Sequence, residues 1–169
     1  MIAWHSAKGD RAASGFRNVT PFRMLYIPNA GLLAITAVVE IAIHGSRTPV
    51  TADELRRRLR LSRRALDPHL QALVRGGILK SVRGARGGYQ LARKPSDISV
   101  EDILRASGIL ERWNDELDDS KSILTRRIVA PALSVAAEEF VRQLREITVS
   151  DFLLATVDGR EAGSRAHDI

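Results

Sequence analysis

Residues 61–92 read LSRRALDPHLQALVRGGILKSVRGARGGYQLA, and this stretch decides the fold of the chain. Leucines at intervals of four and three lie on one side of a helix, so the pattern predicts a buried stripe made of Leu66, Leu70 and Leu73. The pair Gly76-Gly77 then ends the helix through a left-handed C-cap. Two short β-prone segments follow, on either side of a basic, glycine-rich turn. A helix followed by such a hairpin predicts a winged helix-turn-helix.

The residues just before this stretch supply the first helix of the pair. Thr51 is a good N-cap, and Glu54 three residues later predicts a capping box. The helix in TADELRRRLR, residues 51–60, turns its leucines inward and its arginines largely outward. A tight turn follows, and Ser62 caps the next helix. Two short helices joined this closely fit a helix-turn-helix, although many unrelated helical pairs share the pattern.

The polar face of the second helix carries side chains that can read DNA bases. Arginine pairs with guanine O6 and N7, glutamine pairs with adenine, and an acidic side chain accepts from cytosine N4. The face consists of Arg63, Arg64, Asp67, Gln71 and Arg75. Because Pro68 has no N–H to donate back to Arg64, we expect the helix to bend or restart near Asp67.

The turn of the hairpin, RGARGG over residues 83–88, is a second candidate DNA contact. Its glycines allow positive φ and let the backbone come close to a groove. Arg83 and Arg86 at the tip could enter a minor groove, where the negative potential attracts guanidinium. The turn does not fit a nucleotide-binding loop, because it opens no helix and lacks the Gly-Lys-Ser/Thr ending.

Charge is divided unevenly along the sequence. The formal net charge is +6, but residues 47–94 hold 13 Lys and Arg against 3 acidic residues, a local net charge of +10. The remainder of the chain carries a net charge of −4. A basic half joined to a mildly acidic half indicates one part for a polyanion and another for protein contacts. A solvated arginine-rich helix face is the alternative explanation.

Composition excludes several classes of protein. The 169 residues contain no cysteine, which rules out disulfides, thiol redox switches and thiolate-ligated zinc or iron–sulfur sites. No apolar run reaches the ~20 residues that span a bilayer, and residues 1–23 lack the apolar core of a secretion signal, so the cytoplasm is expected. The four histidines form no ligand or triad pattern, so we do not expect an enzyme.

The N-terminal part is predicted to contain one buried helix. Residues 1–23 lack periodicity and are expected to be disordered, with a basic arm that touches DNA as the alternative. Residues 25–44 form the first helix, with Pro28 in its first turn and apolar side chains over much of its circumference. Glu40 and His44 could share a metal, but a histidine in the last turn of a helix more often interacts with the helix dipole.

The C-terminal part is predicted to contain a long helix with an apolar seam. Ser99 and Asp102 open a short helix with a capping box, and residues 107–120 are irregular and acidic. Residues 121–147 then read as one long helix, bent or interrupted before Pro131. The seam repeats at four-three-four-three and consists of Leu133, Ala137, Phe140, Leu144 and Ile147.

Such a seam predicts a dimer interface, and packing of the helix against its own domain is the alternative. Thr148 and Asp151 form another capping box, which opens a short final helix. Residues 158–169 are expected to be a polar, disordered tail.

Together these motifs resemble the winged-helix transcription regulators of the bacterial Rrf-two (BadM-type) family. The similarity covers residues 24–155, and the wing sequence VRGARGGY, residues 82–89, is among its most specific parts. ISVEDI at residues 98–103 and ITVSDFL at residues 147–153 also resemble family signatures. Any one of these motifs alone would be weak, but together they are a strong match.

The resemblance implies a homodimer that is crossed through the long helix and binds near-palindromic DNA. Its DNA-reading positions correspond here to Ser62, Arg63, Arg64 and Asp67, and its wing arginine corresponds to Arg83. Family members commonly have three cysteines between the short helix and the dimer helix, where this chain has residues 109–124 and no cysteine. The resemblance therefore implies a cysteine-free member without a thiolate-ligated cluster, and it does not identify an effector.

We therefore expect a mainly α chain with a small β-hairpin wing, in the form of a winged helix-turn-helix plus a long dimerisation helix. Its parts are a disordered extension (1–23), the DNA-binding domain (24–106), an acidic loop at the position of the family's sensor (107–120), the dimerisation helix with a short helix after it (121–157) and a disordered tail (158–169). The candidate DNA contacts are Ser62, Arg63, Arg64, Asp67, Gln71, Arg83 and Arg86.

The expected function is that of a sequence-specific DNA-binding transcriptional regulator, a repressor, which acts as a homodimer through residues 121–147. Its partner is double-stranded DNA, and no cofactor is expected. The alternative is a winged-helix interaction module that contacts a transcription partner without specific DNA binding.

Overall fold

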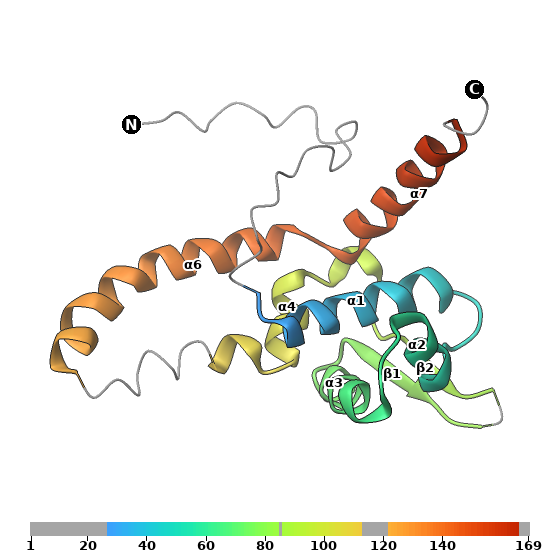
Figure 1. Cartoon of the computed structure of the whole chain (residues 1–169), viewed down its shortest axis with the longest axis horizontal. Coiled ribbons are helices and arrows are strands. Elements are labelled where there is room, and N and C mark those ends of the chain that lie inside the picture. Colours follow the sequence, from blue (N-terminus) through green and yellow to red (C-terminus); the bar gives the residue numbers. More distant parts are fainter. Residues whose placement is uncertain (1–26, 85, 113–121, 166–169) are drawn as a thin grey trace.

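The computed structural model describes residues 27–84, 86–112 and 122–165, with side-chain surroundings up to residue 157 (Figure 1). Helices α1 (Asn29–His44), α2 (Ala52–Leu59) and α3 (Arg63–Arg75) precede strands β1 (Leu79–Val82) and β2 (Gly88–Leu91). A 3-10 turn (Pro95–Asp97), α4 (Val100–Ala106), α6 (Ala130–Glu146) and α7 (Val149–Arg165) follow. The expected fold class, mainly helical with one antiparallel hairpin, is confirmed.

Local capping fixes the helix-turn-helix. The Thr51 hydroxyl accepts from the Glu54 N–H at 3.1 Å, and the Ser62 hydroxyl accepts from the Ala65 N–H at 3.3 Å. The expected capping box at Thr51 is only half formed, because the Glu54 carboxylate binds Arg58 instead, at 2.8 Å. Between the helices Arg60 takes the left-handed conformation with φ 54°, and this single residue makes the tight turn.

The end of α3 follows the predicted glycine route. Gly77 has φ +68°, its N–H donates to Val74, and the Ile78 N–H donates to Leu73 at 3.0 Å. These two bonds are the Schellman motif, which satisfies carbonyls that the helix leaves open and turns the chain into β1.

The predicted restart of the helix near Asp67 is wrong, because α3 runs without interruption from Arg63 to Arg75 with Pro68 inside it. The proline ring removes one donor, the one that would have bonded to the Arg64 carbonyl. Both Pro68 and Arg64 are exposed, so water can hydrate that carbonyl. The buried leucines Leu66, Leu70 and Leu73 meanwhile hold both halves of α3 against the core.

The wing is a two-stranded hairpin attached to the start of α2. Leu79 pairs with Leu91, and Val82 pairs with Gly88 at the end of the ladder. Val50 adds a one-residue bridge to Tyr89 through two backbone bonds of 2.8 and 3.0 Å. A Cβ on Gly88 would lie 2.5 Å from the Val50 carbonyl oxygen, so this close approach requires glycine.

Two apolar clusters meet at α1 and α4. The first joins α1 to α2, α3 and the wing, and the second joins α1 and α4 to α6. α4 contributes to both, since Ile103 lies in the first cluster while Val100 and Leu104 lie in the second. The short helix α4 therefore lies between two parts of the molecule: the helix-turn-helix with its wing (α2, α3, β1 and β2) on one side and the long helix α6 on the other.

Two further boundaries differ from those expected. α1 begins at Asn29 with Pro28 as its N-cap, and residues 1–26 lie outside the described residues. Residues 109–112 are helical rather than irregular, because burial of Ile109 and Leu110 in the second cluster stabilises that turn. Residues 113–121, which include most of the expected acidic loop, lie outside the described residues.

No helix in the described part of the chain has the length and apolarity needed to cross a membrane.

The long helix is interrupted before Pro131, as predicted. Residues Thr125–Val129 form a π-helical turn, and the Ala130 N–H donates to the Thr125 carbonyl. Such a turn re-pairs carbonyls next to a residue that has no N–H. The final helix, in contrast, is longer than expected: α7 extends to Arg165, so residues 158–165 are not part of a disordered tail. Once a helix has been nucleated, each further residue adds a backbone bond, and no proline stops it here.

A near-repeat in the sequence forms the junction between α4 and α7. ISVEDIL at residues 98–104 and ITVSDFL at residues 147–153 each place a hydroxyl residue before a helix and an aspartate three residues later. The two segments lie antiparallel, joined by Val100 N–H to Ile147 O at 2.8 Å and Val149 N–H to Ile98 O at 2.9 Å. The two helices therefore start from one shared backbone bridge.

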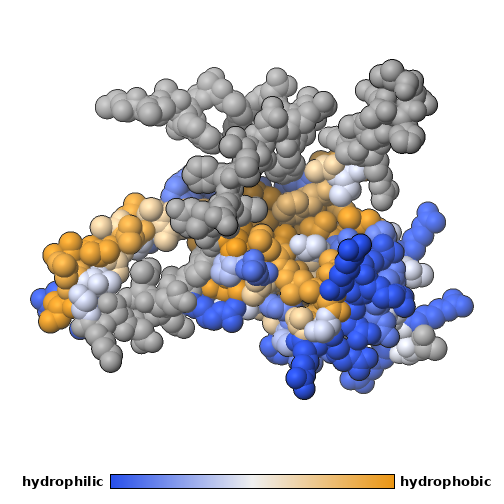
Figure 2. Space-filling model, in the orientation of Figure 1, coloured by the Kyte–Doolittle hydropathy of each residue, from blue (hydrophilic) through white to orange (hydrophobic). Residues whose placement is uncertain are grey.

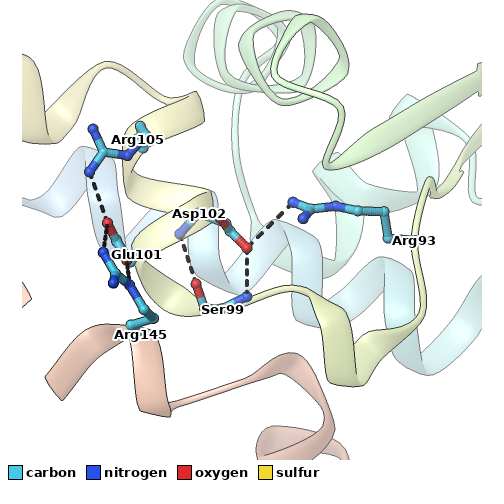
Figure 3. Close-up of polar contacts among 6 residues, drawn as sticks. All are labelled: Arg93, Ser99, Glu101, Asp102, Arg105 and Arg145. Atoms are coloured by element: carbon cyan, nitrogen blue, oxygen red, sulfur yellow. Dashed lines mark hydrogen bonds and ion pairs between the residues drawn. The ribbon is translucent and has the colours of Figure 1, made fainter. Parts of the chain in front are cut away.

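Glu101 adds a side-chain connection beside this bridge (Figure 3). Its carboxylate is buried, with 7% of the side chain exposed, and accepts from Arg145 Nε of α6 at 2.5 Å and from a second Arg145 nitrogen at 3.1 Å. Arg105 of its own helix also donates to it, at 2.8 Å. The hydrogen bond from Arg145, followed by that from Arg105, lowers the pKa of Glu101 to about 2.

Replacing Glu101 by glutamine should remove an acid-sensitive part of the stability. The folded pKa of about 2 lies below the ordinary 4.5, so the ion pairs contribute fully above pH 4.5, and the contribution is lost as the pH falls towards 2. We expect wild type to have a higher urea midpoint than Glu101→Gln at pH 7, with the gap narrowing steadily below pH 4.5. A gap that does not change with pH would mean that Glu101 contributes through packing alone.

Candidate nucleic-acid interface

The start of α3 presents a cluster of polar side chains to solvent. Ser62, Arg63 and Arg64 are exposed, and all three lie in the cap and first turn. The Ser62 oxygen accepts the Ala65 N–H, which leaves its own hydroxyl proton able to donate outward. The free N–H groups and positive dipole end of a helix N-terminus favour an anion such as a DNA phosphate.

The polar face of α3 continues along the helix as an inclined row. Arg63, Asp67, Gln71 and Arg75 follow one another at intervals of four, so the row turns by about 40° around the helix at each step, away from the side of the buried leucines. Gln71 and Arg75 are exposed and Asp67 is half-buried. Arg63 lies 3.8 Å from Asp53 of α2, an exposed ion pair that costs little to break when a phosphate competes.

A groove connects this helical face to the wing. It has a volume of about 270 Å³ and is lined by Gln71, Val74, Arg75, Ser81 and Tyr89. Residues from α3 and from both strands therefore face one space, which sequence spacing alone did not reveal. A base edge or sugar can lie in such a groove while the backbone of the nucleic acid contacts its rims.

The wing tip holds Arg83 and Arg86 out in solvent. Gly84 has φ +115°, and the Gly87 N–H closes the turn on the Gly84 carbonyl at 2.9 Å. A Cβ on Gly87 would lie 2.5 Å from the Val82 carbonyl oxygen, so a larger residue would push the turn open. Ala85, between the two arginines, is outside the described residues.

Among the arginines of the basic segment, residues 47–94, two groups differ in their ion pairing. Arg56 pairs with Asp53, and Arg58 pairs with Glu54 and lies 2.9 Å from His44. Within the described part of the chain, the side chains of a second group have neither a hydrogen bond nor an ion pair: Arg57, Arg60, Arg64, Arg83 and Arg86. The first group therefore stabilises α2, and the second group is available for a polyanion.

The structure adds two positions to the candidate set. Arg57 and Arg60 are exposed at the end of α2, immediately before α3. The arginine run had indicated an outward face, but only the left-handed turn at Arg60 places these side chains next to the start of α3. Figure 2 shows that hydrophilic surface covers the side of the molecule that holds α2, α3 and the wing, whereas apolar surface lies over α1 in the middle of the view and at the far end of α6.

The histidines of this region have structural roles. His69 is half-buried on α3, and burial followed by the nearby charge of Arg112 lowers its pKa, so it stays neutral at physiological pH. His44 lies 3.5 Å from Glu40 and also contacts Arg58. No set of three or more histidine, aspartate or glutamate side chains converges on a metal position in the described ranges.

The predicted seam of α6 divides into two halves. Phe140, Leu144 and Ile147 pack into the second apolar cluster, so the alternative of packing within the domain holds for this half. Leu133 and Ala137 continue the same face but are exposed, with Leu133 52% exposed. Figure 1 shows this part of α6 extending away from the other helices. Exposed apolar side chains of this part of α6 and of the segment just before it are Ile123, Leu124, Ile128, Val129, Leu133 and Val135.

Curated proteins similar to this chain are transcriptional regulators. Protein rrf2 of Nitratidesulfovibrio vulgaris is 32% identical over 119 residues, which is 69% of this chain and 79% of that protein. A putative HTH-type transcriptional regulator of Synechocystis is 28% identical over 70% of this chain and 80% of its own length. The HTH-type regulator IscR of Vibrio atlanticus is 32% identical over 47% of this chain and 46% of its own.

Solved structures of the same kind superpose on the whole fold. IscR of T. potens has 30% identity and a TM-score of 0.61, covering 80% of this chain and 89% of that one. CymR of B. subtilis, described as the global cysteine regulator, has 25% identity and a TM-score of 0.56, covering 76% and 96%.

A sequence model of the Rrf2 family, described as iron-dependent transcriptional regulators, matches residues 27–155. The chain has no cysteine, so thiolates cannot hold iron here, and the described residues hold no group of three histidine, aspartate or glutamate side chains that could bind a metal ion. The match nevertheless spans α2 and α3, the wing, the backbone bridge from which α4 and α7 start, and the long helix α6. The chain therefore belongs to the Rrf2 family of winged helix-turn-helix transcriptional regulators.

Proposed function

We propose that this protein is a homodimeric repressor that binds a near-palindromic DNA operator. The observation that carries the proposal is the group of unpaired cations on one unit, with Arg64 on α3 and Arg83 and Arg86 on the wing. Because these side chains have no intramolecular ion pair, no such pair has to be broken when they bind phosphate. The membership of the family and its DNA-regulatory relatives support the same reading.

Different residues would supply affinity and specificity. Arginines at the end of α2 and the start of α3 would contact phosphates, which gives salt-dependent and sequence-independent affinity. Asp67 and Gln71, in the middle of the helical face, would contact base edges in the major groove. Arg83 would enter the adjacent minor groove, where a narrow groove concentrates negative potential.

The exposed half of the α6 seam would join two protomers. Residues Leu133 and Ala137 extend a face whose other half is already buried, so a second copy of the helix can continue the same packing. Two reading units joined in this way would meet half-sites about one helical turn, ~34 Å, apart. This is the physical reason for expecting a near-palindromic operator.

We further propose that the protein acts without a bound cofactor. The absence of cysteine removes thiolate ligands, and residues of the described part do not gather other metal ligands. The alternative function, a winged-helix interaction module, would keep the dimer but lose salt-sensitive DNA binding. A titration of DNA at two salt concentrations separates the two functions, because only phosphate binding weakens steeply with salt.

Arg83→Ala should weaken binding to the preferred operator by about tenfold or more, because a wing arginine in a groove contributes on the scale of a base contact. Fluorescence anisotropy at fixed salt measures the loss. Arg142→Ala is the matched control, since it removes the same charge from α6, where Arg142 pairs with Glu139 at 2.6 Å. Equal affinity of wild type and Arg83→Ala would contradict the assignment of the wing.

Asp67→Ala should change which base pair is preferred at one position of each half-site. The carboxylate accepts from cytosine N4 and repels the acceptors of other bases, and alanine does neither. Selection of bound sites from random DNA by both proteins provides the comparison. If the two selections return one and the same motif, Asp67 does not read a base.

Leu133→Glu should convert the dimer to monomer, because a charge would be buried in the seam. Sedimentation velocity across a concentration series measures the change. Val135→Glu is the matched control, since Val135 is also exposed, at 69%, but lies about 200° around the helix from Leu133. Dissociation by Val135→Glu alone would place the interface on the opposite face of α6.

A further inference from the structure

The ion pairs of Glu101 connect two parts of the chain to which the proposed function gives different tasks. Glu101 lies on α4, which packs with α1 and α3 in the DNA-binding unit. Arg145 lies on α6, whose N-terminal half carries the exposed seam. Figure 3 shows the Arg145 guanidinium reaching across to the Glu101 carboxylate, while Arg105 approaches from α4 itself.

The ion pair fixes the orientation of α6 relative to α4, because Arg145 binds the Glu101 carboxylate with two nitrogens. Its Nε donates to one carboxylate oxygen at 2.5 Å, and a terminal nitrogen donates to the other at 3.1 Å. A two-point guanidinium–carboxylate pair fixes the angle between its partners as well as their distance. The carboxylate is 7% exposed, so water has little access with which to replace the arginine.

A second attachment lies nearby in the sequence. The backbone bridge between residues 98–100 and 147–149 joins the same two elements just beyond Arg145. If the backbone bridge were the only attachment, α6 could rotate about it relative to α4. The ion pair between Glu101 and Arg145 attaches the two helices at a second point and prevents that rotation. The apolar packing of Leu144 resists separation, but it is less directional than a bidentate ion pair.

Operator recognition by a dimer requires this kind of fixed angle. Adding one base pair between half-sites moves the second half-site by about 3.4 Å and rotates it by about 35°. A dimer can discriminate between such spacings only if neither reading unit turns freely on the dimer helix.

We propose that Glu101 and Arg145 are positioning residues that fix the DNA-binding unit on α6 and thereby set the half-site spacing that the dimer accepts. The inference rests on the proposed function and deepens it. It goes beyond DNA binding as such, because each isolated half-site should be bound equally well with or without the pair.

Two substitutions of the same chemical type separate positioning from simple charge. Arg145→Gln removes the contact between α4 and α6, whereas Arg105→Gln removes a contact within α4 to the same carboxylate. Both variants lose one positive charge beside the same carboxylate. Arg145→Lys, which keeps the charge but not the two-point geometry, is the second variant if Arg145→Gln does not fold, as judged by its thermal transition.

The DNA readout compares operators whose half-sites are separated by spacers that differ in steps of one base pair. We expect wild type and Arg105→Gln to bind the best spacer about tenfold more tightly than its neighbours, and Arg145→Gln to bind all of them within about threefold. Affinity for a single half-site should be equal in all three proteins. A merely stabilising contact would lower all affinities together and leave the spacing preference intact.

The second readout needs no DNA. Because the chain has no cysteine, Lys80→Cys on exposed β1 gives one spin label per protomer and one label-to-label distance per dimer. We expect a narrow distance distribution with wild type and Arg105→Gln backgrounds, and a broadened one with Arg145→Gln.

The outcomes distinguish the two proposals. If wild type binds no operator or gives no label-to-label distance, the dimeric DNA-binding function fails, and this inference fails with it. If wild type binds DNA as a dimer but accepts all spacers equally, this inference alone is overturned. If wild type shows a spacing preference and a narrow distance distribution while Arg145→Gln keeps both, the positioning role is overturned and the proposed function stands.

Discussion

The backbone bridge between residues 98–100 and 147–149 is the contact on which the arrangement of this protein depends. It joins the start of α4 to the corner between α6 and α7, two points almost fifty residues apart. Each strand of the bridge carries a capped helix start, with Asp102 bonded to the Ser99 N–H and Asp151 bonded to the Thr148 N–H. Without this bridge the long helix would be attached to the DNA-binding unit by side-chain packing and ion pairs alone.

Several parts of the molecule meet at the first turn of α4. Arg93, which follows β2, approaches Asp102 at 3.4 Å, and Arg145 of α6 reaches Glu101 in the same turn (Figure 3). The wing and the long helix therefore contact neighbouring residues of one short helix. α4 also supplies side chains to both apolar clusters. Because α4 is closely packed, a displacement of α6 would be transmitted through α4 to the wing.

Pairing of charges gives the arginine-rich half two different uses. Arg56 and Arg58 are held by acidic residues of their own helix, while Arg64 on α3 and Arg83 and Arg86 on the wing tip have no ion pair within the described part of the chain. The acidic half of the chain uses its carboxylates mainly for α4 and α6, as at Glu101 and Glu139. The charge asymmetry of the sequence therefore corresponds to a spatial division between an arginine-rich surface, which we propose binds DNA, and a scaffold.

The sequence by itself determined the local elements: the caps at Thr51, Ser62 and Ser99, the glycine stop after α3, the two strands of the hairpin and the interruption before Pro131. These features depend on a few neighbouring residues, so their spacing is sufficient to predict them. Tertiary structure alone decided that α3 runs through Pro68, that the α6 seam is buried in one half and exposed in the other, and that Glu101 meets Arg145. Each of these depends on which distant surfaces pack together, since burial can override a missing hydrogen bond and an ion pair across forty-four residues leaves no periodic trace in the sequence.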